Sequence, residues 1–146
     1  IPGTWISNRE EKLEAYKNVT TCINESQLTD LATDWVNRYG LIPKPVESLL
    51  QIMNLKLLAK HCGFYSIKNK KPNIILLTRM QSNAFKYLKE DLPSNIQNKF
   101  IFQNEKQQSK IIIRGLGILE TQNQIDNLIK WLSIMSKSVD KLLQKK

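Results

Sequence analysis

Apolar positions recur at helical spacing from the start of the chain. Ser7 and Glu10 have the spacing of a capping box, in which each side chain bonds the backbone amide of the other residue, so a helix is predicted to start there. The pattern ends near Cys22. The apolar residues of this first helix repeat at three-residue steps and are expected to face inward: Leu13, Tyr16 and Val19.

A second helix is predicted to begin at a capping residue, either Asn24 or Ser26, and to end at Gly40, because glycine adopts the left-handed cap conformation without steric cost. Its expected inner face is Leu28, Leu31, Ala32, Trp35, Val36 and Tyr39.

A third helix is predicted from about Pro45, which suits a first helical turn, to Gly63. Its expected apolar positions are Val46, Leu49, Leu50, Met53, Leu57 and Leu58.

After Gly63 the period changes to that of strands. Residues 64–68 and 73–78 are short, aromatic or β-branched segments separated by Asn, Lys and Pro, which is typical of a β-hairpin. Residues 99–103 and 110–114 form a second predicted pair across a polar turn, closed by Gly115 and Gly117.

Two more helices complete the pattern. Residues 82–91 are expected to turn Phe85 and Leu88 inward, and a long amphipathic helix is predicted from about Thr121. Its apolar seam is Ile125, Leu128, Leu132, Met135, Val139 and Leu142. Packing on this domain's own elements is preferred over a coiled-coil partner. The predicted fold is therefore α+β, with a helical segment, a small mainly antiparallel sheet with a crossing helix and a long C-terminal helix, in one domain over residues 1–146.

Composition is close to the globular average, with 41% apolar and 24% charged residues. No apolar run approaches the roughly 20 residues that cross a bilayer, and no signal peptide is recognised, which predicts a cytoplasmic protein. The net charge of +9 is uneven, because residues 1–62 hold seven basic and seven acidic residues whereas residues 63–146 hold fifteen and six. A basic second half is compatible with association with nucleic acid or an acidic surface, although solvated surface lysines are the preferred interpretation.

Chemical motifs give no enzyme site. No phosphate-binding loop is present, and Gly115-Leu116-Gly117 lacks the rest of a dinucleotide fingerprint. His61 is the sole histidine, and we expect it to end the third helix rather than to act in catalysis. Cys22 and Cys62 form no zinc pattern and are expected to be reduced, buried thiols. We therefore predict no catalytic, cofactor-binding or metal-binding residue, and core positions for Trp5, Trp35 and Trp131.

The run W-V-N-R-Y-G-L-I-P-K-P-V at residues 35–46, continuing into Leu49-Leu50 and the segment L-K-L-L-A at 55–59, resembles a stretch of the bacterial transcription-repair coupling factors, the Mfd family. Residues 1–16 are similar to the start of the last domain of those proteins. The sequence likeness is dense over residues 1–62. From residue 63 to about 118 it is reduced to a shared order of strands and helices, and in the final helix only the type of element is shared. The chain is thus identified as a fragment of a larger translocase.

The resemblance implies a non-catalytic regulatory domain beyond a helicase-like motor. In that family the full protein displaces stalled RNA polymerase and recruits UvrA, and its terminal domain covers the UvrA-binding surface of a UvrB-like module and restrains the motor until polymerase is engaged. ATP, magnesium, DNA and polymerase would then be bound by other domains, with no cofactor held here.

The resemblance implies that three residues of the second helix make the contact with the UvrB-like module. Asp34, Asn37 and Arg38 match family positions that usually hold an acidic residue, Asp and Arg, and a spacing of three and four residues places them side by side on a helix. Asn37 departs from the family Asp and lacks its negative charge. The competing interpretation is a surface ion pair between Asp34 and Arg38 with no partner.

A second hypothesis is a nucleic-acid-binding module in the basic half, and a small enzyme is a third. The candidate phosphate contacts of the second hypothesis are Lys68, Lys70, Lys71, Lys99, Lys106, Lys110 and Arg114. Phe100 and Phe102 are as well suited to the core as to base stacking.

Overall fold

The computed structural model describes residues 5–6 and 8–144. The chain divides into two compact units, Ile1–Leu57 and Leu58–Lys146. A single domain over residues 1–146 stays a prediction. Among the described residues, no helix is both long enough and apolar enough to span a membrane.

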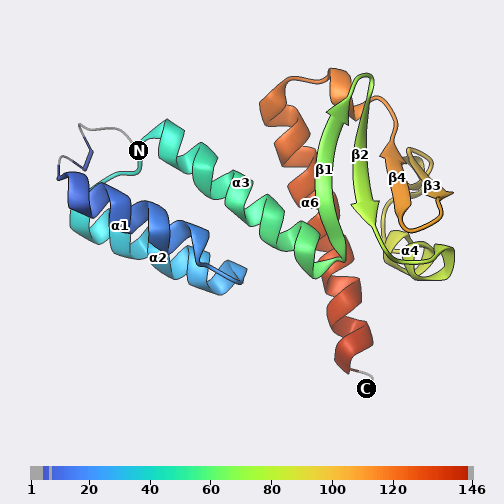
Figure 1. Ribbon diagram of the computed structural model, residues 1–146, viewed down its shortest axis with the longest axis horizontal. Coiled ribbons are helices and arrows are strands. Elements are labelled where there is room, and N and C mark those ends of the chain that lie inside the picture. Colours follow the sequence, from blue (N-terminus) through green and yellow to red (C-terminus); the bar gives the residue numbers. More distant parts are fainter. Residues whose placement is uncertain (1–4, 7, 145–146) are drawn as a thin grey trace. The chain divides into compact units, whose positions relative to one another are not determined.

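Helices build the first unit, in which α1 is Arg9–Thr20, α2 is Glu25–Tyr39 and α3 starts at Lys44 (Figure 1). The predicted cap Ser7 lies outside the described residues, and Asn8 caps α1 by accepting hydrogen bonds from the amides of Glu10 and Glu11 at 2.8 and 3.1 Å. Asn24, one of the two predicted alternatives, caps α2. Gly40 ends α2 at φ 86°, in agreement with the prediction.

The inner face of α1 was predicted correctly at Val19 and wrongly at Leu13 and Tyr16. Leu13 and Tyr16 are 63% and 57% exposed, whereas Ala15 and Val19 are buried. The two small side chains let α1 pack closely, and the larger apolar residues lie on another side of the helix. Val36 of α2 is likewise exposed rather than inward. The buried residues of this core come from the first unit's three helices and the segment before α1: Ile6, Ala15, Val19, Trp35 and Val46.

The second unit begins within α3, which ends at His61, and contains a four-stranded antiparallel sheet of order β1-β2-β4-β3. The strands are β1 Phe64–Lys70, β2 Asn73–Thr78, β3 Phe100–Asn104 and β4 Ser109–Ile113. Both predicted hairpins are confirmed, with β3 starting one residue later and β4 one residue earlier than expected. The pairing of β2 with β4 joins the two hairpins into one sheet.

Helices α4, Ser82–Lys89, and α6, Thr121–Gln144, cover one face of this sheet (Figure 1). Phe85 of α4 lies 6.2 Å from Phe100, and Phe100 lies 5.7 Å from Trp131 of α6, measured between ring centroids. The long helix α6 therefore packs against the sheet of its own unit, which is the arrangement preferred from the sequence. Leu142, one of the apolar residues predicted for its buried side, is 46% exposed. The sequence did not predict the short helices α5, Ser94–Gln97, and η1, Leu116–Ile118.

Gly117 has no room for a side chain. A Cβ atom there would lie 2.7 Å from the backbone oxygen of Asn73 and 2.8 Å from the side-chain oxygen of Asn69. Its amide donates to the Pro72 oxygen at 3.0 Å, and its own carbonyl accepts from Asn69 at 3.1 Å. The glycine thereby ties η1 to the turn between β1 and β2, a contact that the sequence did not predict.

The packing of α6 is testable with one substitution at two positions. Leu132→Ala removes a side chain that is 1% exposed, and the free energy of unfolding should fall by about 2–5 kcal/mol because of lost burial and a residual cavity. Leu143→Ala, at a position that is 57% exposed in the same helix, should change it by less than about 0.5 kcal/mol. Chemical denaturation monitored by circular dichroism measures both free energies of unfolding. Equal losses of stability in the two variants would contradict the burial of this side of α6.

Candidate functional site

The C-terminal end of α2 presents the three residues that the sequence singled out. Asp34, Asn37 and Arg38 are all exposed. The Asp34 carboxylate lies 3.9 Å from the Arg38 guanidinium, and their side chains are 54% and 63% exposed. An exposed pair at this distance contributes little to stability, so both groups remain available to a partner.

Aromatic packing fixes which side of α2 is exposed. Trp35 is 2% exposed. The centroid of the Trp5 ring lies 5.7 Å from that of Trp35 and 5.4 Å from that of Tyr39, so the three rings form one cluster. Trp35 thus faces the core as predicted, and Tyr39 is half-buried. With these rings turned inward, Asp34, Asn37 and Arg38 are left at the surface.

Two carboxylates of α1 join this surface, which the sequence did not predict. Glu11 and Glu14 line a small cavity of about 100 Å³ together with Arg38 and Tyr39. The Tyr39 hydroxyl donates a long hydrogen bond of 3.4 Å to the Glu11 carboxylate. Partial desolvation and then the charge of Glu11 raise the pKa of Tyr39, while Arg38 lowers it.

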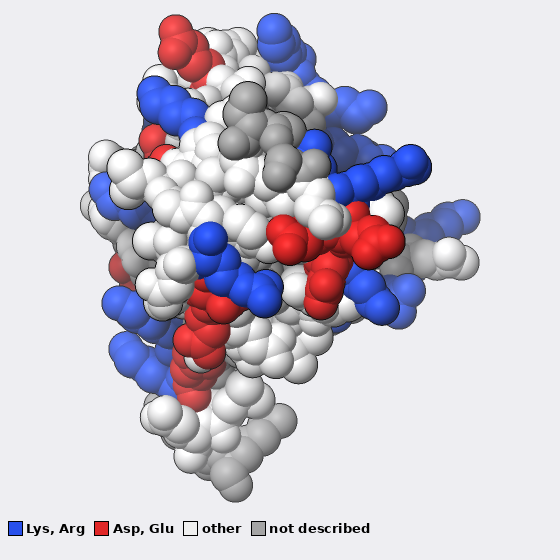
Figure 2. All heavy atoms as spheres, turned by 90° about the vertical axis from the view of Figure 1, so that its left-hand side faces the viewer, with Lys and Arg blue, Asp and Glu red and all other residues white. Residues whose placement is uncertain are grey.

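The α1–α2 surface is defined here as Glu11, Glu14, Asp34, Asn37 and Arg38. It carries three carboxylates and one guanidinium, so its net charge is negative. Figure 2 views the molecule from the side of the N-terminal helices and shows acidic side chains gathered on part of that side with Lys and Arg around them. Such a surface suits a partner that presents arginine or lysine.

The seven predicted nucleic-acid contacts do not form one group. The strand register places four of them at the end of the sheet that holds the β1–β2 turn: Lys70, Lys71, Lys99 and Arg114. Lys106 lies in the β3–β4 turn at the opposite end, near Lys110, and Lys68 lies between the two ends.

Two of these seven are already engaged within the protein. Lys110 lies 3.0 Å from the Glu105 carboxylate, and the Arg114 guanidinium donates to the Asn98 backbone oxygen at 2.9 Å. The spread of the seven cations gives no continuous basic stripe.

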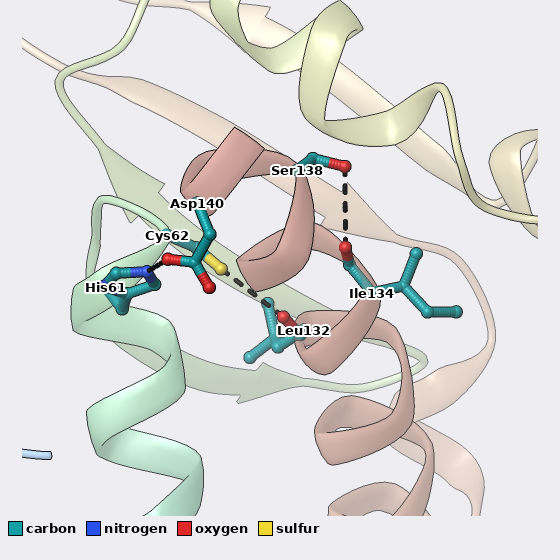
Figure 3. Close-up of polar contacts among 6 residues, drawn as sticks. All are labelled: His61, Cys62, Leu132, Ile134, Ser138 and Asp140. Atoms are coloured by element: carbon teal, nitrogen blue, oxygen red, sulfur yellow. Dashed lines mark hydrogen bonds and ion pairs between the residues drawn. The ribbon is translucent and has the colours of Figure 1, made fainter. Parts of the chain in front are cut away.

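His61 and Cys62 lie against α6, and their contacts indicate a structural role for both residues (Figure 3). His61 ends α3, as predicted, and its Nε2 lies 2.8 Å from the Asp140 carboxylate. The Cys62 thiol is buried and donates to the Leu132 oxygen at 3.5 Å. Burial, and then the charge of Asp140, raise the pKa of Cys62 to about 12, so this thiol is a poor nucleophile at neutral pH. Among the described residues, no three His, Cys, Asp or Glu side chains are grouped as metal ligands.

Comparison with known proteins bears directly on the part of the chain that holds the α1–α2 surface. The family model of the TRCF domain matches residues 1–88. The chain belongs to the TRCF domain family. The match contains the whole α1–α2 surface but ends before β3, β4 and α6.

Relatives of this TRCF domain are much longer proteins. The transcription-repair-coupling factor of Staphylococcus haemolyticus is 34% identical over 70 residues, which are 48% of this chain and 6% of that protein. The factor of Escherichia coli K12 is 28% identical over 76 residues, which are 51% of this chain and 7% of that protein. The matched segment thus spans less than a tenth of the length of these curated relatives.

A solved structure shares the fold of the whole chain. The crystal structure of the C-terminal domain of a transcription-repair coupling factor matches with a TM-score of 0.71 at 18% sequence identity. The match covers 100% of this chain and 89% of that one. The TRCF fold therefore extends through the second unit, where sequence likeness is weak.

The two thiols of this TRCF domain should differ in reactivity and in their effect on stability. At pH 8 an aromatic disulfide reagent should modify half-buried Cys22 well before Cys62, which should react only on unfolding. Because the folded pKa of Cys62 is raised to about 12 from 9.0, its contribution to stability is complete below pH 9 and is lost as pH rises from 9 toward 12. At pH 10 the loss should be about 1 kcal/mol in denaturant titrations.

Cys62→Ala is the control, because it should remove that part of the decline above pH 9 while the other titrating groups remain. An unchanged decline in Cys62→Ala, or rapid modification of Cys62 in the folded protein, would contradict the buried thiol.

Proposed function

We propose that this TRCF domain is a non-catalytic regulatory module of a transcription-repair coupling factor. Its α1–α2 surface masks the UvrA-binding surface of a UvrB-like module in the same protein, in competition with UvrA, and restrains the motor until RNA polymerase is engaged. The observation that carries the proposal is the exposed arrangement of Asp34, Asn37 and Arg38 at the end of α2, inside the part of the chain that the family model matches.

Electrostatics support a protein partner with basic side chains. Bidentate pairing of carboxylates with arginine is among the stronger polar contacts available at a surface. Asn37 offers no charge for such a pair, but Glu11 and Glu14 bring two further carboxylates to the same surface from α1. The negative charge missing at position 37 is thereby offset by a neighbouring helix.

Tethering makes modest contacts sufficient. A module held in the same chain as its target has a high effective concentration, so weak pairwise affinity still keeps the surface covered. A closed-to-open ratio of 99:1 needs only about 2.7 kcal/mol, which a few exposed charge pairs and some apolar contact can supply. A weak masking contact of this size is also easily reversed.

The remaining functions belong, in this proposal, to other domains of a cytoplasmic repair protein. The motor domains would bind ATP and magnesium and act on DNA, and other domains would contact RNA polymerase. The present chain, acting as one domain over residues 1–146, would contribute by occupying a surface.

Reversing the charge of Asp34 tests the proposed mask in the intact protein. Asp34→Arg should place a cation opposite basic partner groups and raise UvrA binding in the absence of RNA polymerase. Loss of a pair worth about 1 kcal/mol raises a small open population roughly fivefold. Pull-down or titration with purified UvrA measures the effect.

Glu90→Arg provides the matched control, since it makes the same type of charge reversal at an exposed position outside the α1–α2 surface. Equal UvrA binding by the wild type and Asp34→Arg would argue against this surface. The same increase in both variants would point to net charge alone.

Restoring the family charge gives a gain-of-function prediction. Asn37→Asp should tighten binding of this chain to the separately produced UvrB-like module about two- to fivefold at low salt, because it adds a carboxylate to the α1–α2 surface. Asn37→Gln, which keeps an amide, should not. Titrations at two salt concentrations with UvrA as competitor decide the matter, and equal affinity of both variants at low salt would rule out a charge contact at this position.

A further inference from the structure

A polar cavity of about 670 Å³ opens at one end of the sheet in the second unit. Two segments line it, the connection from β2 to α4 and the turn between β3 and β4. The lining side chains with donor groups include Arg79, Gln81, Lys106, Gln107 and Gln108. The volume lies within the range of small-ligand pockets and can hold one or two nucleotides.

A bulge in β1 brings an aromatic ring to this end of the sheet. The register of β1 against β2 shifts between Phe64 and Ser66, so Tyr65 is the extra residue, and it is 54% exposed. Bulges redirect a side chain in this way. The Tyr65 hydroxyl donates to the Gln108 side chain, and the Arg79 guanidinium carbon lies 6.0 Å from the ring centroid. Tyr65 is thereby fixed beside the lining residues Arg79 and Gln108.

The charge balance of the cavity is positive. Its one lining carboxylate, Glu105, is engaged by Lys110 at 3.0 Å. Arg79 and Lys106 are exposed, and among the described residues neither has a carboxylate within 4.0 Å. Two cations of the cavity are thus available to an anion.

The start of α4 adds a third source of positive potential. Gln81 is its N-cap residue and lines the cavity, but within the described part of the chain no side chain caps the free amides there. The first turn of α4 contains no acidic residue. Uncapped amides at a helix start attract phosphate groups, and here they adjoin a guanidinium and an ammonium group.

We propose that this cavity binds a short stretch of single-stranded nucleic acid. Arg79, Lys106 and the start of α4 would contact phosphates, and the exposed ring of Tyr65 would stack on a base. Glutamine amides can bond base edges without strong sequence preference. A duplex would expose only stacked bases and a stiff backbone, so Tyr65 favours a strand with free bases.

The site differs from the diffuse lysine set proposed from the sequence. Arg79 and Tyr65 were not in that set, and of its seven cations only Lys106 lines the cavity. Lys70, Lys71, Lys99 and Arg114 lie at the opposite end of the sheet, which makes them internal controls.

The test is fluorescence anisotropy of the full 146-residue chain with labelled 12-mers of oligothymidylate and oligouridylate at about 50 mM salt. Arg79→Gln should weaken binding of the preferred strand at least fivefold, and the control Lys71→Gln, with the same charge change, less than twofold. Tyr65→Leu should weaken it at least fivefold, whereas Tyr65→Phe, which keeps the ring, should stay within threefold. Thermal unfolding of each variant checks that the fold is intact.

Tighter binding of one oligomer identifies DNA or RNA as the strand, and either result supports the site. Equal losses in Arg79→Gln and Lys71→Gln, a duplex 12-mer that binds as tightly as the single strands, or no measurable binding would overturn the proposal. The test contains neither UvrA nor the UvrB-like module, so its outcome is independent of the proposed masking role.

Discussion

Burial of Trp35 is the constraint on which the α1–α2 surface depends. The ring occupies the core of the first unit with Ala15 and Val19 of α1, which fixes the rotation of α2 about its axis. Residues one position before and two or three positions after Trp35 are then directed to solvent. These exposed side chains need no hydrogen-bond network of their own to orient them, because an apolar contact on the other side of the helix sets their direction. The masking role proposed for this surface would depend on core packing as much as on charge.

Much of the fold could be predicted from the spacing of apolar residues and from the capping and turn residues that end the helices and strands. The glycine at position 40 and the seam of α6 gave bounds close to those observed, because caps and amphipathic spacing are local signals. The partly wrong inner face of α1 shows the limit of this reasoning. A rule that turns large apolar residues inward holds for Val19 but fails at Leu13 and Tyr16, which are exposed, while the small Ala15 is buried. The pairing of β2 with β4 is a contact distant in sequence, for which periodicity gives no signal.

The candidate sites were only partly accessible from the sequence. Asp34, Asn37 and Arg38 share one helix, so their adjacency follows from helical spacing alone. Glu11 and Glu14 reach the same surface from another helix, and only the packing of α1 on α2 reveals them. Their spacing of three residues did show that they share a face of α1, but not what that face meets. The polar cavity of the second unit arises in the same way, from a strand bulge and two connections that are far apart in the chain.

The order β1-β2-β4-β3 leaves β1 at an edge of the sheet, where its free backbone groups could recruit a strand from another molecule. Lys68 and Lys70 lie on this strand, and the bulge at Tyr65 interrupts its regular pairing pattern. Repulsion between lysines and a broken hydrogen-bonding register both disfavour addition of a second copy. These features of the edge strand disfavour aggregation through sheet extension, which would matter for a domain that associates weakly and reversibly, as proposed above.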